Sequence, residues 1–185
     1  MEHHSRERKK SDQRKSVDKE NSPLQNPIFL KMQQDPYFRS GYLYQMAGNF
    51  NAAAACYSRS IQTSPSAEAH TFLGWVLSLM GELDGAIFQV RRALELNPEF
   101  GNAWNDLGAY LIEKFAYDEA IDCLNKALNS KGYTQKAFAH YNLGRVYICK
   151  GMFVGAQKAL KQAIKLDPGF MQAKILLEQL NRQVQ

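Results

Sequence analysis

Four stretches of this 185-residue chain align with one another without gaps, and this repetition limits the possible folds more than any other feature. Each stretch has a glycine at the same place, and subtraction gives spacings of 33, 34 and 36 residues between Gly41, Gly74, Gly108 and Gly144. Periods of this length are typical of solenoids, in which each unit buries its apolar face only against its neighbours. The chain is therefore expected to fold as a stack of similar units.

Small residues recur in register after each of these glycines. Twelve residues on stand Ala53, Ala86, Ala120 and Ala156, and seven further on stand Ser60, Ala93, Ala127 and Ala163. Two antiparallel helices approach closely only where their side chains are small. Larger apolar residues follow each first alanine by four positions, on the same helix face: Tyr57, Val90, Leu124 and Leu160. The pattern predicts a helix-turn-helix unit with its closest contact at the glycine.

Prolines mark the expected ends of three units, because proline lacks the amide donor that a helix needs. They are Pro65, Pro98 and Pro168. The third unit has Ser130-Lys131-Gly132 instead, followed by two extra residues. We therefore expect a slightly altered joint between the third and fourth units.

These residues resemble the tetratricopeptide repeat (TPR), and the third unit matches best, with Trp104, Leu107, Gly108, Ala120 and Ala127. The resemblance implies an all-α, right-handed superhelical solenoid with repeats at 34–66, 67–100, 101–136 and 137–170. A helix over 171–185 would cap the last repeat, since its apolar residues fall on one face. They are Ala173, Leu176, Leu177 and Leu180.

Two segments precede the first repeat. Residues 1–22 form a basic tail with no aromatic residue, which predicts disorder. Residues 23–33 are apolar and interrupted by Pro23 and Pro27, which predicts a docking segment. This segment would lie in its own groove or on a neighbouring copy, and the second case would make a homodimer.

Composition and charge restrict the function. No apolar run approaches the roughly 20 residues of a membrane-spanning helix, and the N-terminus lacks a signal-peptide core. Three scattered cysteines favour a reducing compartment, and the predicted location is the cytoplasm. Residues 34–134 carry 7 basic and 11 acidic side chains, whereas residues 135–185 carry 8 and 2, so the basic excess lies at the C-terminal end.

The resemblance also implies where a partner binds, because TPR proteins bind ligands chiefly in the concave groove lined by the first helix of each repeat. Counting along these helices predicts twelve groove residues: Phe38, Tyr42, Met46, Thr71, Trp75, Leu79, Asn105, Ile112, Phe138, Tyr141, Asn142 and Arg145. Aromatic residues dominate the N-terminal part. The Lys, Asn and Arg clamp with which some TPR proteins hold a peptide carboxylate is not present.

No phosphate-binding loop, catalytic triad pattern, HExxH or CxxC occurs, so we expect no enzyme activity, no cofactor and no metal. The expected function is protein–protein interaction, as adaptor, scaffold or chaperone, through a partner segment with apolar anchors. The alternative is a factor associated with RNA or nucleoprotein, using Lys158, Lys161, Lys165 and the basic tail. A redox role for Cys149, beside Arg145, is a further alternative.

Overall fold

The computed structural model describes residues 27–183. The predicted disordered tail, the first four residues of the docking segment and the last two residues of the chain lie outside this range.

Within residues 27–183 all regular secondary structure is α-helical. The helices are α2 (Pro27–Gln34), α3 (Pro36–Met46), α4 (Phe50–Thr63), α5 (Ala67–Leu79), α6 (Leu83–Leu96), α7 (Gly101–Glu113), α8 (Tyr117–Asn129), α9 (Lys136–Cys149), α10 (Phe153–Leu166) and α11 (Met171–Gln183). The all-α solenoid predicted from the repeat is thus confirmed.

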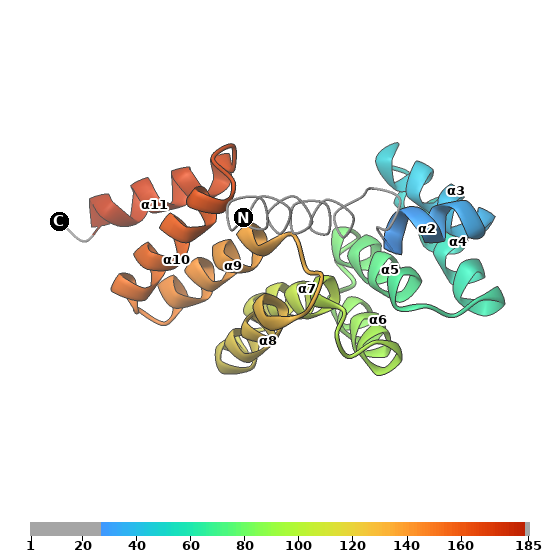
Figure 1. The fold of residues 1–185 in the computed structure, drawn as a ribbon, viewed down its shortest axis with the longest axis horizontal. Coiled ribbons are helices and arrows are strands. Elements are labelled where there is room, and N and C mark those ends of the chain that lie inside the picture. The colour runs from blue at the N-terminus through green and yellow to red at the C-terminus, as the bar shows by residue number, and fades with distance from the viewer. Residues whose placement is uncertain (1–26, 184–185) are drawn as a thin grey trace, which may run out of the picture.

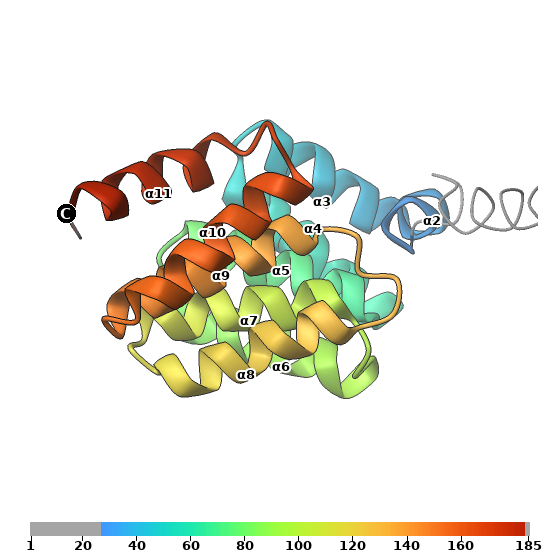
Figure 2. The ribbon, with the colours of Figure 1, turned by 60° about the vertical axis from the view of Figure 1, so that its left-hand side comes forward.

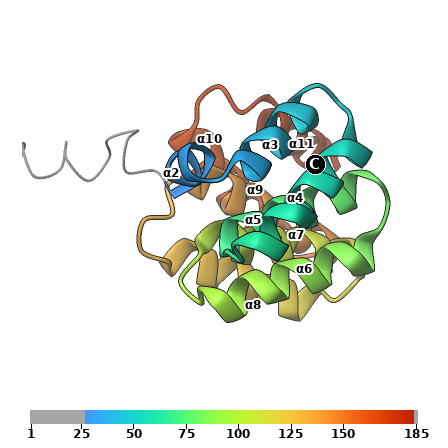
Figure 3. The same ribbon diagram turned by 90° about the vertical axis from the view of Figure 1, so that its right-hand side faces the viewer.

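The helices pair as α3–α4, α5–α6, α7–α8 and α9–α10, and the pairs stack into an open arch (Figure 1). The first helices of successive pairs meet on the inner side of the arch, where α5 contacts α7 and α7 contacts α9. Helix α2 lies beside the start of α3 and reaches α5 (Figure 3). At the other end α11 packs on α10, with Ala173 and Leu180 buried and Leu176 and Leu177 partly buried.

The repeated glycines lie where the two helices of a pair touch. A Cβ atom on Gly74 would lie 2.8 Å from Val90 Cγ2 and 3.0 Å from the backbone oxygen of Ala86. At Gly108 the nearest atom would be Leu124 Cγ, at 2.7 Å. These distances are too short for any larger residue without displacement, so the glycines fix the separation within each pair.

The longer connection between α8 and α9 carries an additional packing residue. Tyr133 is buried against the start of α7, where a Cβ atom on Gly101 would lie 2.5 Å from Tyr133 Cβ. This tyrosine stands in the segment that replaces the proline of the other repeats.

The turn between the two helices of each pair requires one residue with positive φ. Gly48, Gly81 and Gly151 supply it in three pairs, with φ of 75°, 82° and 69°. In the α7–α8 turn the residue is Phe115, with φ of 60° and a side chain that is 77% exposed. A bulky residue in this region is strained, and such strain costs on the order of 1–3 kcal/mol.

Replacement of Phe115 by glycine is therefore expected to stabilise the fold by about 1 kcal/mol, because relief of strain exceeds the added chain entropy of glycine. The free energy of unfolding from urea titrations would measure the gain. Ala116→Gly, next to it in the same turn, is the control and should not stabilise. An unchanged or lower midpoint for Phe115→Gly would show that the turn is not strained.

Candidate partner-binding surface

A continuous aromatic cluster joins the first two helix pairs. The ring of Phe72 on α5 lies 5.1 Å from that of Phe38, 6.1 Å from that of Tyr42 and 5.7 Å from that of Tyr57, between ring centroids. Trp75 continues the cluster at 6.3 Å from Phe72. Phe38 and Tyr57 are fully buried, whereas Trp75 is 42% exposed. The cluster therefore runs from the core to the inner surface.

One turn beyond Tyr42 and Trp75, on the same helix faces, Met46 and Leu79 are also exposed. We call these four residues, Tyr42, Met46, Trp75 and Leu79, the aromatic patch. The rings of Tyr42 and Trp75 are supported from below by Phe72, which restricts their freedom. An aromatic group held in this way loses little entropy when a partner covers it.

The middle of the inner face is polar and hydrogen-bonded within the chain. Asn142 Nδ2 on α9 donates to Asn105 Oδ1 on α7 at 3.1 Å, and Arg145 Nη1 donates to Asn142 Oδ1 at 3.1 Å. The Arg145 guanidinium also pairs with the carboxylate of Glu113. Its charge is thus already balanced, and an acidic partner group would have to displace Glu113. The redox hypothesis for Cys149 requires the positive charge of Arg145 beside the thiol, and the ion pair with Glu113 offsets that charge.

At the C-terminal end, two predicted groove residues pack on Phe170, which precedes α11. The ring of Phe138 lies 4.9 Å and that of Tyr141 lies 5.0 Å from the Phe170 ring. Phe138 remains 47% exposed. This end of the inner face is therefore aromatic as well, but its rings also hold the capping helix in place.

Three of the predicted groove residues are buried and take no part in this polar network: Phe38, Thr71 and Ile112. Phe38 is enclosed by the rings of Tyr57 and Phe72. The hydroxyl of Thr71 donates to the carbonyl oxygen of Ala67 at 2.8 Å, which permits its burial. Asn142 is also buried, although it takes part in the polar network. Tyr42, Met46, Trp75, Leu79, Asn105, Phe138, Tyr141 and Arg145 keep exposed surface.

Asp106 lies next to this polar network and receives a hydrogen bond from Asn105 Nδ2 at 3.2 Å. Burial raises the pKa of its carboxyl group to about 7. The hydroxyl of Tyr133, whose pKa Asp106 raises, is buried without a hydrogen-bond partner among the described residues. A negative charge at Asp106 is therefore poorly compensated.

Because the pKa of Asp106 is higher in the folded than in the unfolded chain, stability should fall as the pH rises from about 4 to about 7. Asp106→Asn removes this titration and is expected to stabilise the chain by about 1 kcal/mol at pH 8, an effect moderated by the residue's remaining solvent contact. At pH 4 the two chains should be equally stable. Urea unfolding at both pH values would decide, and an equal difference at both would refute the assignment.

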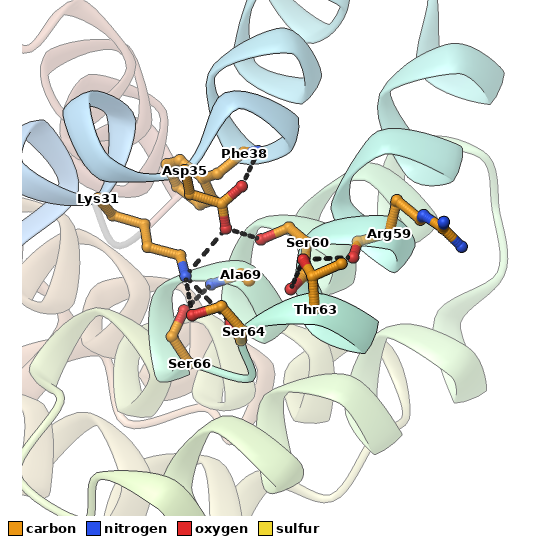
Figure 4. Close-up of polar contacts among 9 residues, drawn as sticks. All are labelled: Lys31, Asp35, Phe38, Arg59, Ser60, Thr63, Ser64, Ser66 and Ala69. Atoms are coloured by element: carbon orange, nitrogen blue, oxygen red, sulfur yellow. Dashed lines mark hydrogen bonds and ion pairs between the residues drawn. The ribbon is translucent and has the colours of Figure 1, made fainter.

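Helix α2 is anchored by a buried ionic network that the sequence did not reveal (Figure 4). Lys31 Nζ lies 3.0 Å from Asp35 Oδ2 and donates to the carbonyl oxygen of Ser64 at 3.0 Å. Asp35 also accepts from Ser60 Oγ at 2.6 Å and from the Phe38 amide at 3.0 Å. Burial alone would raise the pKa of Asp35, but these three partners hold it below its ordinary value. The polar Ser60, where other repeats have alanine, was the available signal.

The apolar residues of α2 divide between two environments. Ile28 and Met32 pack against the core of the first two helix pairs, while Phe29 and Leu30 are 38% and 39% exposed. The described part of the predicted docking segment thus packs on its own chain. It covers the start of α3 and part of α5 and leaves the aromatic patch exposed.

Between residues 27 and 183, no three His, Cys, Asp or Glu side chains are grouped so that they could hold a metal ion. None of the helices in this range is long and apolar enough to cross a membrane.

Models of the tetratricopeptide repeat match residues 38–90, 80–137 and 137–170. The chain is 25% identical over 147 residues to the type IV pilus assembly protein PilF of Pseudomonas aeruginosa, covering 79% of this chain and 58% of PilF. It is 26% identical over 118 residues to the BBSome complex member BBS4 homolog of Drosophila melanogaster, covering 64% of this chain and 24% of that protein. The chain thus matches less than two thirds of the length of either relative.

The solved structure of PilF superposes with a TM-score of 0.75 at 24% identity, over 80% of this chain and 68% of PilF, and this likeness shows the fold. YrrB, described as a TPR protein with an unusual peptide-binding site, superposes with a TM-score of 0.62 at 25% identity. That match covers 74% of this chain and 70% of YrrB.

Proposed function

The chain belongs to the tetratricopeptide repeat family, whose members generally mediate protein–protein interactions, and on this premise we propose that its aromatic patch binds an apolar-anchored segment of a partner protein. The observation that carries the proposal is the exposure of Met46, Trp75 and Leu79, beside the partly exposed Tyr42, with the rings of Tyr42 and Trp75 against that of Phe72. Tyrosine and tryptophan supply a large share of the binding energy at protein interfaces.

The polar network beside the patch complements it. Asn105 and Arg145 keep exposed surface while their hydrogen bonds fix their positions. They are suited to binding the backbone of an extended segment whose apolar side chains lie on the aromatic patch. An apolar-anchored peptide or helix fits this arrangement better than a free carboxylate, since Arg145 is already paired with Glu113.

The relatives favour a role in assembly. PilF is named for pilus assembly, BBS4 for membership of a complex, and YrrB for its peptide-binding site. By analogy this chain would act as an adaptor, scaffold or chaperone that holds a partner segment rather than as an enzyme. A cytoplasmic location accords with its three unpaired cysteines.

The test is quantitative affinity capture from the native cell with the full-length chain, with partners identified by mass spectrometry. Trp75→Ala, alone and with Tyr42→Ala, is expected to weaken capture of the principal partner at least tenfold. Phe88→Ala is the matched control, because Phe88 is more exposed than Trp75, at 61% against 42%, but belongs to α6, the second helix of its pair. Equal losses for Trp75→Ala and Phe88→Ala would refute the proposal.

Within the described part of residues 23–33, Phe29 and Leu30 are the exposed apolar side chains that self-association could use, because Ile28 and Met32 pack within the chain. Light scattering of the full chain and of Phe29→Ser/Leu30→Ser distinguishes the cases. Dimer mass that falls to monomer mass in the variant would support self-association, and monomer mass in both would exclude it.

A further inference from the structure

A second exposed apolar cluster lies at the edge of the arch, away from the aromatic patch. The α7–α8 turn presents Phe115, the α9–α10 turn presents Met152, and the start of α10 presents Phe153 and Val154. The two turns lie side by side on the left of Figure 2, and Lys150 in the α9–α10 turn forms an ion pair with Asp118 in the first turn of α8. Phe115 and Val154 are the most exposed of these residues, at 77% and 84%.

Phe115 occupies its position at a cost to the fold. The three equivalent turns have glycine where positive φ is needed, and only this turn carries a large side chain. Its ring contacts Tyr117 at 6.2 Å between centroids but gains little burial from the contact. The backbone strain therefore serves no packing purpose within the described residues, and strained residues of this kind concentrate at binding sites.

A basic stripe begins at this cluster. Lys158, Lys161 and Lys165 follow Val154 at intervals of four, three and four residues, so all four side chains lie along one face of α10. The three lysines are exposed, and none forms an ion pair with any residue between 27 and 183. Helix α10 contains no acidic residue. At 1.5 Å per residue the stripe is about 16 Å long.

We propose that this surface, comprising Phe115, Met152, Val154, Lys158, Lys161 and Lys165, binds an acidic protein segment that carries an apolar anchor at one end. Charge complementarity favours an acidic segment, because the three lysines stand in a single row and form no ion pair with any residue between 27 and 183. The apolar cluster sets the orientation of the bound segment. Its apolar anchor would lie at the α7–α8 turn, and its carboxylates would lie along α10. We call this set of six residues the edge surface.

A nucleic acid fits these features less well. A phosphate chain uses many cations and gains little from aliphatic side chains such as those of Met152 and Val154. An acidic peptide uses both the cations and the apolar end. The edge surface shares no residue with the aromatic patch, so the two surfaces can be occupied by different segments at the same time.

The experiment selects ligands for the full-length chain from a displayed library of random 16-residue peptides, without assuming any sequence. Ligands are then sorted by their loss of binding to a variant with Lys158→Glu, Lys161→Glu and Lys165→Glu. The control variant has Lys131→Glu, Lys136→Glu and Lys174→Glu, which changes the net charge equally at other exposed positions. The proposal expects a class of ligands rich in Asp and Glu, with an apolar residue near one end.

These ligands should bind the α10 variant at least thirtyfold more weakly and the control variant within threefold of the wild-type chain. Phe115→Gly, which should be more stable than the wild type, should lose at least fivefold, so any loss cannot come from unfolding. Absence of such a class, or equal effects of the two triple variants, would overturn the proposal. Tighter binding of a twelve-residue uridine oligonucleotide through the same lysines would overturn it in favour of RNA.

Discussion

Replacement of Asp35 by alanine is expected to lower the free energy of unfolding by about 3 kcal/mol, the usual cost of removing one partner from a buried ion pair. The side chains of Lys31 and Asp35 are only 10% and 7% exposed. Without Asp35, the Lys31 ammonium stays buried with only Ser64 as partner, and the Ser60 hydroxyl and the Phe38 amide each lose their acceptor. Helix α2 should detach from α3 and α5.

Urea unfolding would measure the loss, and hydrogen exchange would show whether the amides of α2 lose protection before those of α5. Glu178→Ala is the control, since Glu178 and its partner Arg182 are both exposed and their ion pair contributes little. Its expected effect is below about 0.5 kcal/mol. Equal effects of the two substitutions would mean that the Asp35 network does not anchor α2.

The Asp35 network also predicts a dependence on pH. The pKa of Asp35 is lower in the folded than in the unfolded chain, so its contribution to stability is present above about pH 4. The contribution should be lost as the pH falls through the folded-state pKa. The stability difference between the wild type and Asp35→Ala should therefore shrink in acid, and a difference that is constant with pH would contradict the role of the charge.

Replacement of Gly74 by alanine is expected to cost about 2 kcal/mol, although alanine is the better helix former. The added methyl group would lie 2.8 Å from Val90 Cγ2 and 3.0 Å from the Ala86 carbonyl oxygen, and the backbone oxygen cannot move aside without separating α5 from α6. The penalty from this contact exceeds the gain in helix propensity.

Gly85→Ala in the adjacent helix α6 provides the matched comparison. The nearest atom to its Cβ would be Leu77 Cδ1, at 3.4 Å, followed by two atoms of Glu82 at 4.0 Å, which are ordinary contacts. This substitution should stabilise the chain by about 0.5 kcal/mol through helix propensity. The same chemical change is thus predicted to have opposite signs at two sites in one repeat. Thermal unfolding would measure the change in midpoint temperature for each substitution. A change of the same sign for both would mean that the close contact at Gly74 does not limit the separation of α5 and α6.

The fold could be predicted from the sequence because all four repeats carry small residues at the same positions of the helix contact. Glycines at one position and alanines at two others leave one way to pair the helices, and Gly74, Gly108 and Gly144 all contact the predicted partner residues. The substitution of Ser60 for alanine was visible but unexplained. Its partner Asp35 lies 25 residues away, and a buried pair at this separation has no local sequence signal.

The surface was harder to predict than the fold. Counting along a helix fixes the direction of a side chain to within about one residue, or 100°. It does not show which residues are covered by the next inner helix. Phe38 and Thr71 lie one turn before Tyr42 and Trp75 on the same helix faces, yet they are buried, whereas Trp75 is 42% exposed. Exposure depends on contacts between repeats, which the sequence of one helix does not contain.

The most direct test of the central claim places a photo-crosslinking amino acid at position 75, and separately at position 88, in the chain expressed in its native cell. Both positions carry an exposed aromatic residue, but only position 75 belongs to the aromatic patch. A specific crosslinked partner from position 75, which competes with the untagged wild-type chain and is absent from position 88, is the predicted result. The same partner at equal yield from both positions, or from position 88 alone, would contradict the claim that the inner face binds it.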